Sequence, residues 1–165
     1  MTGLLAQLVI DSTCQVFQMM LLTDVEAGEP EPIDQKMELS GITGIIGFAG
    51  KDGSCLLHLN CPAETAKDIA AKMLGMELES LDEAKDAIGE MANMIAGNVK
   101  SFLVDMGLQL ELAIPTTVSG EAFEISIDSD TPVSLRIPFK YDGGRFDVVL
   151  ILSSGMVEFL ESKGM

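Results

Sequence analysis

The sequence predicts a single α+β domain, residues 1–165, in which helices pack on an antiparallel or mixed β-sheet. Three stretches repeat apolar residues at helical spacing, at residues 4–22, 63–74 and 80–106. Between and after them lie β-branched and period-two runs, typical of strands. Helices and strands in separate blocks of one chain indicate the α+β class.

Composition supports a well-packed core and a cytoplasmic location. The chain is 47% apolar, so disorder is not expected. No apolar run approaches the roughly 20 residues that cross a bilayer, and the N-terminus lacks the pattern of a signal peptide. The cysteines Cys14, Cys55 and Cys61 are expected to be reduced, and with a single histidine, His58, no metal site is expected.

The net charge is −16, which excludes two classes of partner. Nucleic acids and anionic membrane surfaces are bound through Lys and Arg, and the chain has only ten of these in total. The sequence therefore predicts neither a nucleic-acid-binding nor a membrane-binding protein.

The first half predicts a helix, a connector and a hairpin. The helix at 4–22 is followed by an acidic connector at 23–32 with one glycine and two prolines. Residues 33–60 predict strands, with a tight turn at 50–53 between two of them. Glycines recur every third residue from Gly41, but a hairpin and not a helix follows, so a phosphate-binding loop is not predicted.

Two helices then follow in succession. Pro62 suits the start of the helix at 63–74, and Gly75 suits its end. Ser80 and Glu83 have the spacing of a capping box, which predicts that the long helix begins there.

The second half predicts strands and one more hairpin. The pattern changes to period two after Gly107, and residues 141–144 predict a turn. The strand at 146–152 is apolar at both alternating sets of positions, so burial on both faces is expected. From Gly155 onward a short amphipathic tail or helical turn is expected. The predicted strands lie at residues 108–112, 122–127, 133–139 and 146–152.

The long helix carries two opposed stripes at about 100° per residue. The apolar stripe is expected to face the core and consists of Ile88, Met91, Ile95, Val99, Phe102 and Met106. The other stripe places Asp86, Glu90, Asn93 and Gly97 in one row. On spacing alone such a row is more often an ordinary solvated helix face than a functional site.

The row resembles a known signature. Asp86, Glu90 and Asn93, followed by residues 94–98, resemble the signature helix of the CheC/CheX/FliY chemotaxis phosphatase family. The first helix ending at 16–21, the glycine-rich hairpin and residues 64–70 are similar to CheX-like members as well. The first helix offers only Asp11, Gln15 and Gln18 at comparable spacing, and one signature per chain is the CheX-like and not the CheC-like pattern.

The resemblance implies a phosphatase acting on a phosphorylated CheY-like response regulator. Its substrate would be an aspartyl phosphate, with Mg²⁺ and a lysine supplied by the regulator, so no cofactor of this chain's own is implied. An amide can hold a water by its carbonyl oxygen and a phosphoryl oxygen by its NH₂, a role that suits Asn93. Glu90 would pair with the regulator's lysine, with Asp86 extending the contact and Gly97 allowing close backbone approach.

The resemblance also implies a homodimer whose sheets join edge to edge. Two alternatives remain open at this point. One is a non-catalytic CheX-like docking module for a response regulator or a flagellar switch component, because a fold does not by itself fix an activity. The other, which no residue supports directly, is a small-molecule binder that uses space under the helices.

Overall fold

The computed structural model describes residues 1–128 and 131–165. Its helices are α1 (Thr2–Leu21), α2 (Ala63–Leu74), α3 (Lys85–Asp105) and α4 (Ser154–Ser162), with a 3₁₀ turn η1 (Asp82–Ala84) before α3. Its strands are β1 (Glu26–Ala27), β2 (Glu31–Pro32), β3 (Lys36–Gly50), β4 (Gly53–Cys61), β5 (Glu111–Leu112), β6 (Thr116–Ser126), β7 (Val133–Tyr141) and β8 (Gly144–Leu152).

The strands of the described residues form one curled sheet. Its order is β1-β7-β8-β4-β3-β5, with β2 added to β7 and β6 added to β3. Each pairing between these strands is antiparallel, which settles the choice between an antiparallel and a mixed sheet. The predicted α+β class is confirmed.

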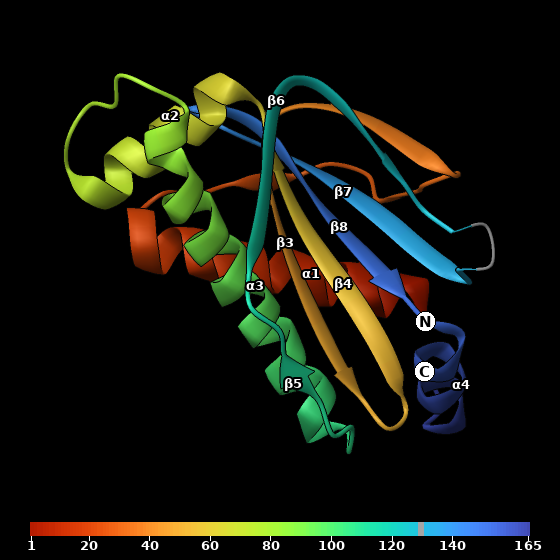
Figure 1. Ribbon diagram of the computed structural model, residues 1–165. Coiled ribbons are helices and arrows are strands. Elements are labelled where there is room, and N and C mark those ends of the chain that lie inside the picture. The colour runs from red at the N-terminus through yellow and green to blue at the C-terminus, as the bar shows by residue number, and fades with distance from the viewer. Residues whose placement is uncertain (129–130) are drawn as a thin grey trace.

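Helices α1 and α3 cross one face of this sheet and also pack on each other, while α2 and α4 flank it (Figure 1). The main core lies between these helices and the sheet. It contains Val9 and Phe17 of α1 and Ile88, Met91 and Ile95 of α3, each 1% exposed or less. Burial of such side chains contributes about 1.5–3 kcal/mol each, so this layer holds α3 in place.

Strand β8 lies between β7 and β4 and is buried on both faces, as expected, because a different hydrophobic cluster covers each face. Val148, Leu150 and Leu152 join the main core under the helices. On the opposite face, called the outer face below, Val149 and Ile151 pack with Met37 and Ile127 in a second small cluster.

Several strand boundaries differ from the sequence expectation. The connector at 23–32 contains β1 and β2, the strand predicted at 122–127 begins at Thr116, and only Glu111–Leu112 pair within 108–112. These backbone segments are recruited by partners far away in the chain, β7 for the connector and β3 for the others. Local patterns carry no information on such pairing.

The predicted capping box does not form. The carboxylate of Glu83 accepts a hydrogen bond from the backbone N–H of Glu79 at 3.0 Å, and Ser80 makes no side-chain cap. The chain enters α3 through η1, where Lys85 pairs with Asp82 at 2.7 Å. 3₁₀ turns are common at the start of α-helices. Here η1 takes up residues predicted to belong to the first turn of the helix, so α3 begins slightly later than predicted.

Phe102 was predicted to face the core, and this is wrong. It is 37% exposed and lines a groove between α1 and α3 together with Leu4 and Leu8. Leu103 takes the fully buried position one turn after Val99. The ideal helical wheel fails here because the groove side of this end of α3 is only partly covered by α1.

By length and hydropathy α1 meets the criterion for a membrane span, the one described helix that does so, with 20 residues and a mean hydropathy of 1.3. This differs from the sequence expectation that no apolar run approaches the length of a membrane span. Half of the apolar window is buried inside the molecule. Its buried side includes Leu5, Val9 and Phe17, so packing against α3 and the sheet accounts for its apolar face.

Candidate functional site

The long helix α3 rests directly on the sheet at a glycine. A Cβ built on Gly44 of β3 would lie 3.0 Å from Cβ of Ala92 and 3.1 Å from the carbonyl oxygen of Ile88. Such distances leave almost no room for a side chain at Gly44. Contact of backbone with backbone makes α3 a rigid mount for whatever its outward face presents.

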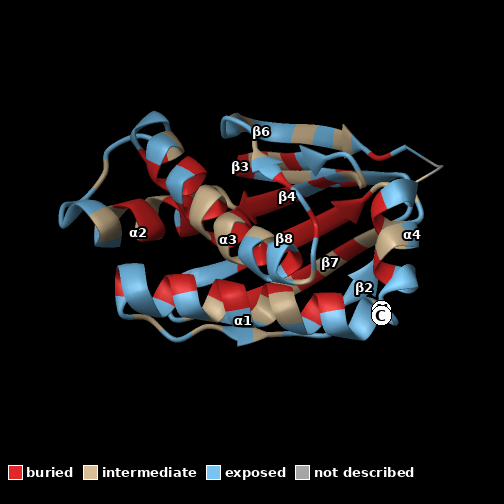
Figure 2. Ribbon diagram, turned by 90° about the horizontal axis from the view of Figure 1, so that it is seen from below, coloured by how far each residue is buried: buried red, intermediate tan, exposed pale blue. Residues whose placement is uncertain are grey.

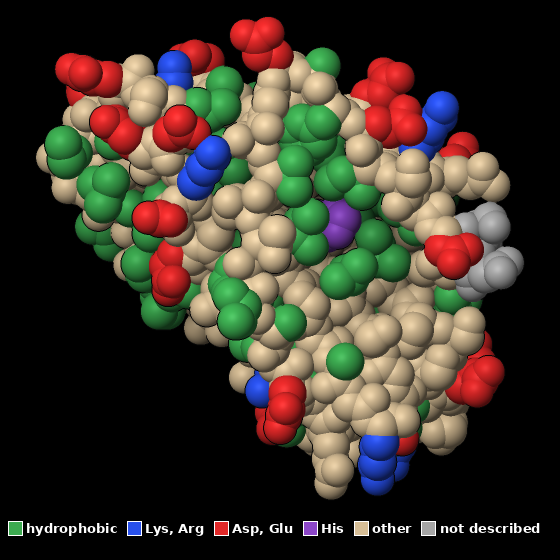
Figure 3. Space-filling view, viewed as in Figure 1, with side chains coloured by type: hydrophobic (Ala, Val, Ile, Leu, Met, Phe, Trp, Pro, Cys, Tyr) green, Lys and Arg blue, Asp and Glu red, His purple; other side chains and the backbone are tan. Residues whose placement is uncertain are grey.

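The outward face of α3 carries the four residues of the predicted row. Asp86 and Glu90 are exposed, and Asn93 and Gly97 are half-buried. At 1.5 Å of rise per residue, Glu90 and Asn93 lie about 4.5 Å apart along the helix axis, and the whole row spans roughly 16 Å. Acidic side chains are frequent over α2 and α3 on this surface (Figure 3).

Within the described chain, the side chains of Asp86, Glu90 and Asn93 have no hydrogen-bond or ion-pair partner. A carboxylate and an amide one helical turn apart are therefore free to bind something outside the chain. The helix backbone fixes the directions of their Cα–Cβ bonds, so these side chains leave the helix toward the same side.

Two of the three comparable residues of α1, Asp11 and Gln15, have partners inside the molecule, whereas the exposed Gln18 has no side-chain partner in the described chain. Asp11 accepts a hydrogen bond from Gln7 at 2.8 Å. Gln15 accepts one from the side-chain amide of Asn98, at 3.3 Å, across the α1–α3 contact. Asn98 thus makes a contact between the two helices, and Asp11 and Gln15 of α1 differ in this respect from the free side chains of Asp86, Glu90 and Asn93 on α3.

Gly97 leaves an opening beside the row. A Cβ built there would have no neighbour within 4 Å. The hydroxyl of Ser101 donates to the Gly97 carbonyl at 3.0 Å. An approaching backbone could come closer to α3 here than at any position with a side chain.

No group of three or more His, Cys, Asp or Glu side chains positioned to hold a metal ion occurs among residues 1–128 and 131–165. His58 lies on the outer face, 3% exposed and framed by hydrophobic side chains, away from α3 (Figure 3). Burial lowers its pKa to about 4 and leaves it neutral at pH 7. It therefore contributes no charge near the row of α3.

Comparison with known proteins identifies the family. The family model described as "Chemotaxis phosphatase CheX" matches residues 42–140. The chain belongs to this family. Over 148 residues the chain is 29% identical to a protein of Thermotoga maritima described as "CheY-P phosphatase CheX", covering 88% of this chain and 94% of that one.

Solved structures of the same group share the fold. A CheC-like superfamily protein from Shewanella sp. PV-4 superposes with a TM-score of 0.82 at 26% identity, over 91% of this chain and 97% of that one. A structure titled as the CheX-CheY-BeF3-Mg²⁺ complex from Borrelia burgdorferi has a TM-score of 0.73 at 26% identity, covering 90% and 97%. The resemblance to CheX-like proteins found in the sequence is thus confirmed.

One feature of the structure was not foreseen from the sequence. A polar cavity on the outer face brings together Asn60, Arg136, Arg145 and Asp147. Three of them belong to the β7–β8 hairpin and one to β4. The only local sequence feature that points to this cavity is that both arginines of the chain fall within ten residues of each other. That feature alone does not predict a binding site.

Proposed function

We propose that this CheX-family chain is a phosphatase that hydrolyses the aspartyl phosphate of a CheY-type response regulator. One observation carries the proposal. Glu90 and Asn93 stand one turn apart on a rigid helix, without partners in the described chain, in a protein whose T. maritima relative is described as a CheY-P phosphatase.

In the proposed reaction Asn93 positions the attacking water. The carbonyl oxygen of its amide accepts a hydrogen bond from the water, and its NH₂ donates to a phosphoryl oxygen. The water oxygen forms the new bond to phosphorus while the bond from phosphorus to the regulator's carboxylate oxygen breaks. The products are the free aspartate carboxylate and inorganic phosphate, which keeps the protons of the water.

Glu90 is proposed to hold the two proteins in register. Its exposed carboxylate would pair with the regulator's lysine, and Asp86 would extend that contact by one turn. The open surface at Gly97 would admit the regulator's backbone next to Asn93. These roles divide the row into a water-positioning amide and three docking positions.

The proposed reaction uses Mg²⁺ that belongs to the regulator. The Borrelia structure is titled as a complex of CheX with CheY, BeF3 and Mg²⁺, consistent with a metal that comes with the partner. The metal would stabilise charge on the phosphoryl group, and this chain would supply orientation. A cytoplasmic location follows from the proposed partner.

A homodimer through β6 completes the proposal. This strand runs over 11 residues and pairs only with β3, so its other edge is unpaired within the described chain. It lies at the margin of the sheet and is largely exposed or half-buried (Figure 2). A long free edge is a ready template for pairing, and a second copy of β6 would cover it.

The direct test mixes phosphorylated regulator with a tenth as much of this protein and follows the aspartyl phosphate over time. The proposal expects loss faster than the regulator's own decay, with many phosphates released for each molecule of this protein. Binding of the phosphorylated regulator with no acceleration would instead favour the docking-module alternative.

A further inference from the structure

A cavity of about 290 Å³ lies on the outer face of the sheet, where β3, β4, β7 and β8 meet. Asn60 and Asp147 are cross-strand partners on β4 and β8, so their side chains share this face. Leu59 and Val148, which precede Asn60 and follow Asp147 in the chain, point into the main core instead. The sheet therefore separates this cavity from α3 and from the row that carries the proposed function.

The cavity concentrates the arginines of the chain. Arg136 and Arg145 are its only two, in a protein of net charge −16, and both line this one cavity. Arg136 pairs with Asp147 at 3.2 Å and Glu31 at 3.5 Å. Arg145 has no ion pair within the described chain, and Thr65 fixes its backbone by donating to its carbonyl at 2.7 Å.

Buried polar atoms without partners gather at the same place. Asn60 is 4% exposed, and both its amide nitrogen and its amide oxygen lack a hydrogen bond. The Nε of Arg136 and the hydroxyl of Thr43, the cross-strand partner of Asn60, also lack one. Each such group costs about 1–3 kcal/mol, so a cluster of them indicates a missing binding partner.

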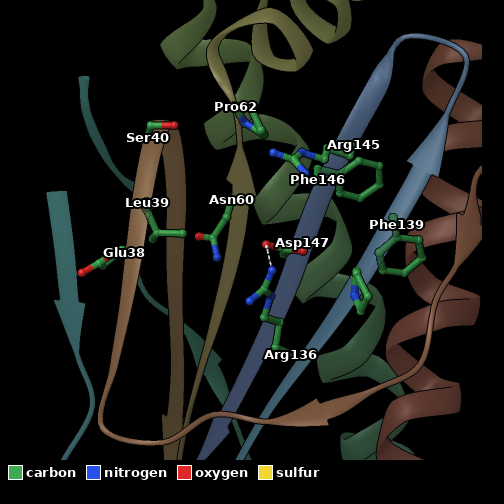
Figure 4. Close-up of a pocket in the computed structure, with 11 residues that line it drawn as sticks. Glu38, Leu39, Ser40, Asn60, Pro62, Arg136, Phe139, Arg145, Phe146 and Asp147 are labelled. Atoms are coloured by element: carbon green, nitrogen blue, oxygen red, sulfur yellow. Dashed lines mark ion pairs between the residues drawn. The ribbon is translucent and has the colours of Figure 1, made fainter. Parts of the chain in front are cut away.

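The side chains converge on one space (Figure 4). Asn60 and Asp147 lie side by side, with Arg136 on one side of them and Arg145 on the other. The apolar part of the cavity wall includes the side chains of Pro62 and of Leu39, which lies next to Asn60 in the view. A donor set, an acceptor set and an apolar wall thus face each other within a small volume.

We propose that this cavity binds a small α-amino acid with an apolar side chain. Its carboxylate would take Arg145, the free Nε of Arg136 and the NH₂ of Asn60, because guanidinium and amide donors suit a carboxylate. Its ammonium group would take Asp147 and the amide oxygen of Asn60. Both amide atoms of Asn60 and the Nε of Arg136 are closed off at the cavity wall in the structure, so binding would require these two side chains to turn toward the ligand.

The zwitterion fits better than other small ligands. Asp147 would repel a phosphate, whereas it attracts an ammonium group. Burial raises the pKa of Asp147 against the lowering effect of Arg136, so a second nearby cation would favour its ionised form. The volume lies at the lower end for ligand pockets, which suits a small metabolite and not a nucleotide.

The test is calorimetric titration of the purified protein with L-valine, L-leucine, L-alanine, L-serine and L-phenylalanine. The matched controls are 3-methylbutanoate, which is valine without its amine, and 2-methylpropylamine, which is valine without its carboxylate. We expect saturable binding of an apolar amino acid at about millimolar affinity or tighter, and at least tenfold weaker binding of both controls.

Variants locate the site. R145Q and N60L are expected to weaken binding at least tenfold, whereas K140Q is expected to leave it unchanged, because Lys140 is the exposed cross-strand neighbour of Arg145 outside the cavity. The side-chain amide signals of Asn60 are expected to shift on titration in ¹H–¹⁵N spectra.

Three results would overturn the proposal. The first is that no amino acid of the panel binds at concentrations up to about 10 mM. Ordered water alone would then be the partner of the buried polar groups, whether or not N60L stabilises the protein. The second is that 3-methylbutanoate binds as tightly as L-valine. The third is that R145Q and K140Q bind L-valine equally well.

Discussion

Asn98 on α3 donates its side-chain N–H to the amide oxygen of Gln15 on α1, at 3.3 Å. Five residues earlier on the same helix, Asn93 has no such partner in the described chain. The two amides therefore separate two uses of one residue type, an intramolecular helix contact and a group free to act on something else. This difference makes Asn98 a matched control for Asn93.

Glu90→Ala is expected to weaken regulator docking more than turnover. Removing one charge of an intermolecular pair raises KM about tenfold at low salt, and the difference from wild type shrinks as salt screens the pair. Steady-state dephosphorylation at two ionic strengths measures both effects. The control is Asp105→Asn, an exposed acidic residue at the far end of α3, about 22 Å along the axis. Equal KM values for the two variants would remove Glu90 from the docking surface.

Gly97→Ala is expected to separate stability from activity. Alanine favours the helix interior by about 0.5–1 kcal/mol over glycine, and the new methyl group meets nothing within 4 Å, so the free energy of unfolding should rise. The same methyl group would stand where the regulator's backbone approaches, so KM should rise as well. Urea denaturation and dephosphorylation kinetics measure the two quantities. A variant that is more stable and equally active would show that Gly97 admits no partner.

His58 is expected to make the fold sensitive to mild acid. Its pKa is about 4 in the folded protein because of burial and 6.5 in the unfolded chain, so between these values the unfolded state binds the extra proton. The stabilisation present above about pH 6.5 is lost as the pH falls toward 4. At about 1.4 kcal/mol for each pH unit between the two values, the loss approaches roughly 3 kcal/mol.

The comparison of wild type with His58→Leu isolates this effect, since all carboxylates are common to both proteins. Urea denaturation at pH 7 and pH 5 should show a smaller loss of stability for the variant. An identical loss in both proteins would mean that His58 does not titrate in this way.

The sequence was enough to predict the class, the helices and the central hairpins. Helical periodicity located α1, α2 and α3, and alternation located β7 and β8, because these elements carry their burial pattern within themselves. It could not show β1, β2 or the start of β6, which exist only through pairing with distant strands. Ser80 and Phe102 were misplaced because capping and burial depend on neighbours that local patterns do not specify.

Part of the candidate site could likewise be predicted from the local sequence, and part depends on the tertiary structure. The spacing of Asp86, Glu90, Asn93 and Gly97 places them on one helix face, and no other element is needed to bring them together. Their lack of partners and the close contact of Gly44 with α3 are tertiary facts. The outer-face cavity was missed because Asn60 and Asp147 are far apart in the chain and become neighbours only through the pairing of β4 with β8.

The rate of dephosphorylation by Asn93→Ala, measured beside wild type and Asn98→Ala, tests the proposed function most directly. All three proteins are compared at saturating phosphorylated regulator, with circular dichroism to verify that each is folded. The account predicts a loss of about 10²-fold or more in kcat for Asn93→Ala, because a group that orients the water acts in the transition state, and a near wild-type kcat for Asn98→Ala. A folded Asn93→Ala protein with wild-type kcat would contradict it.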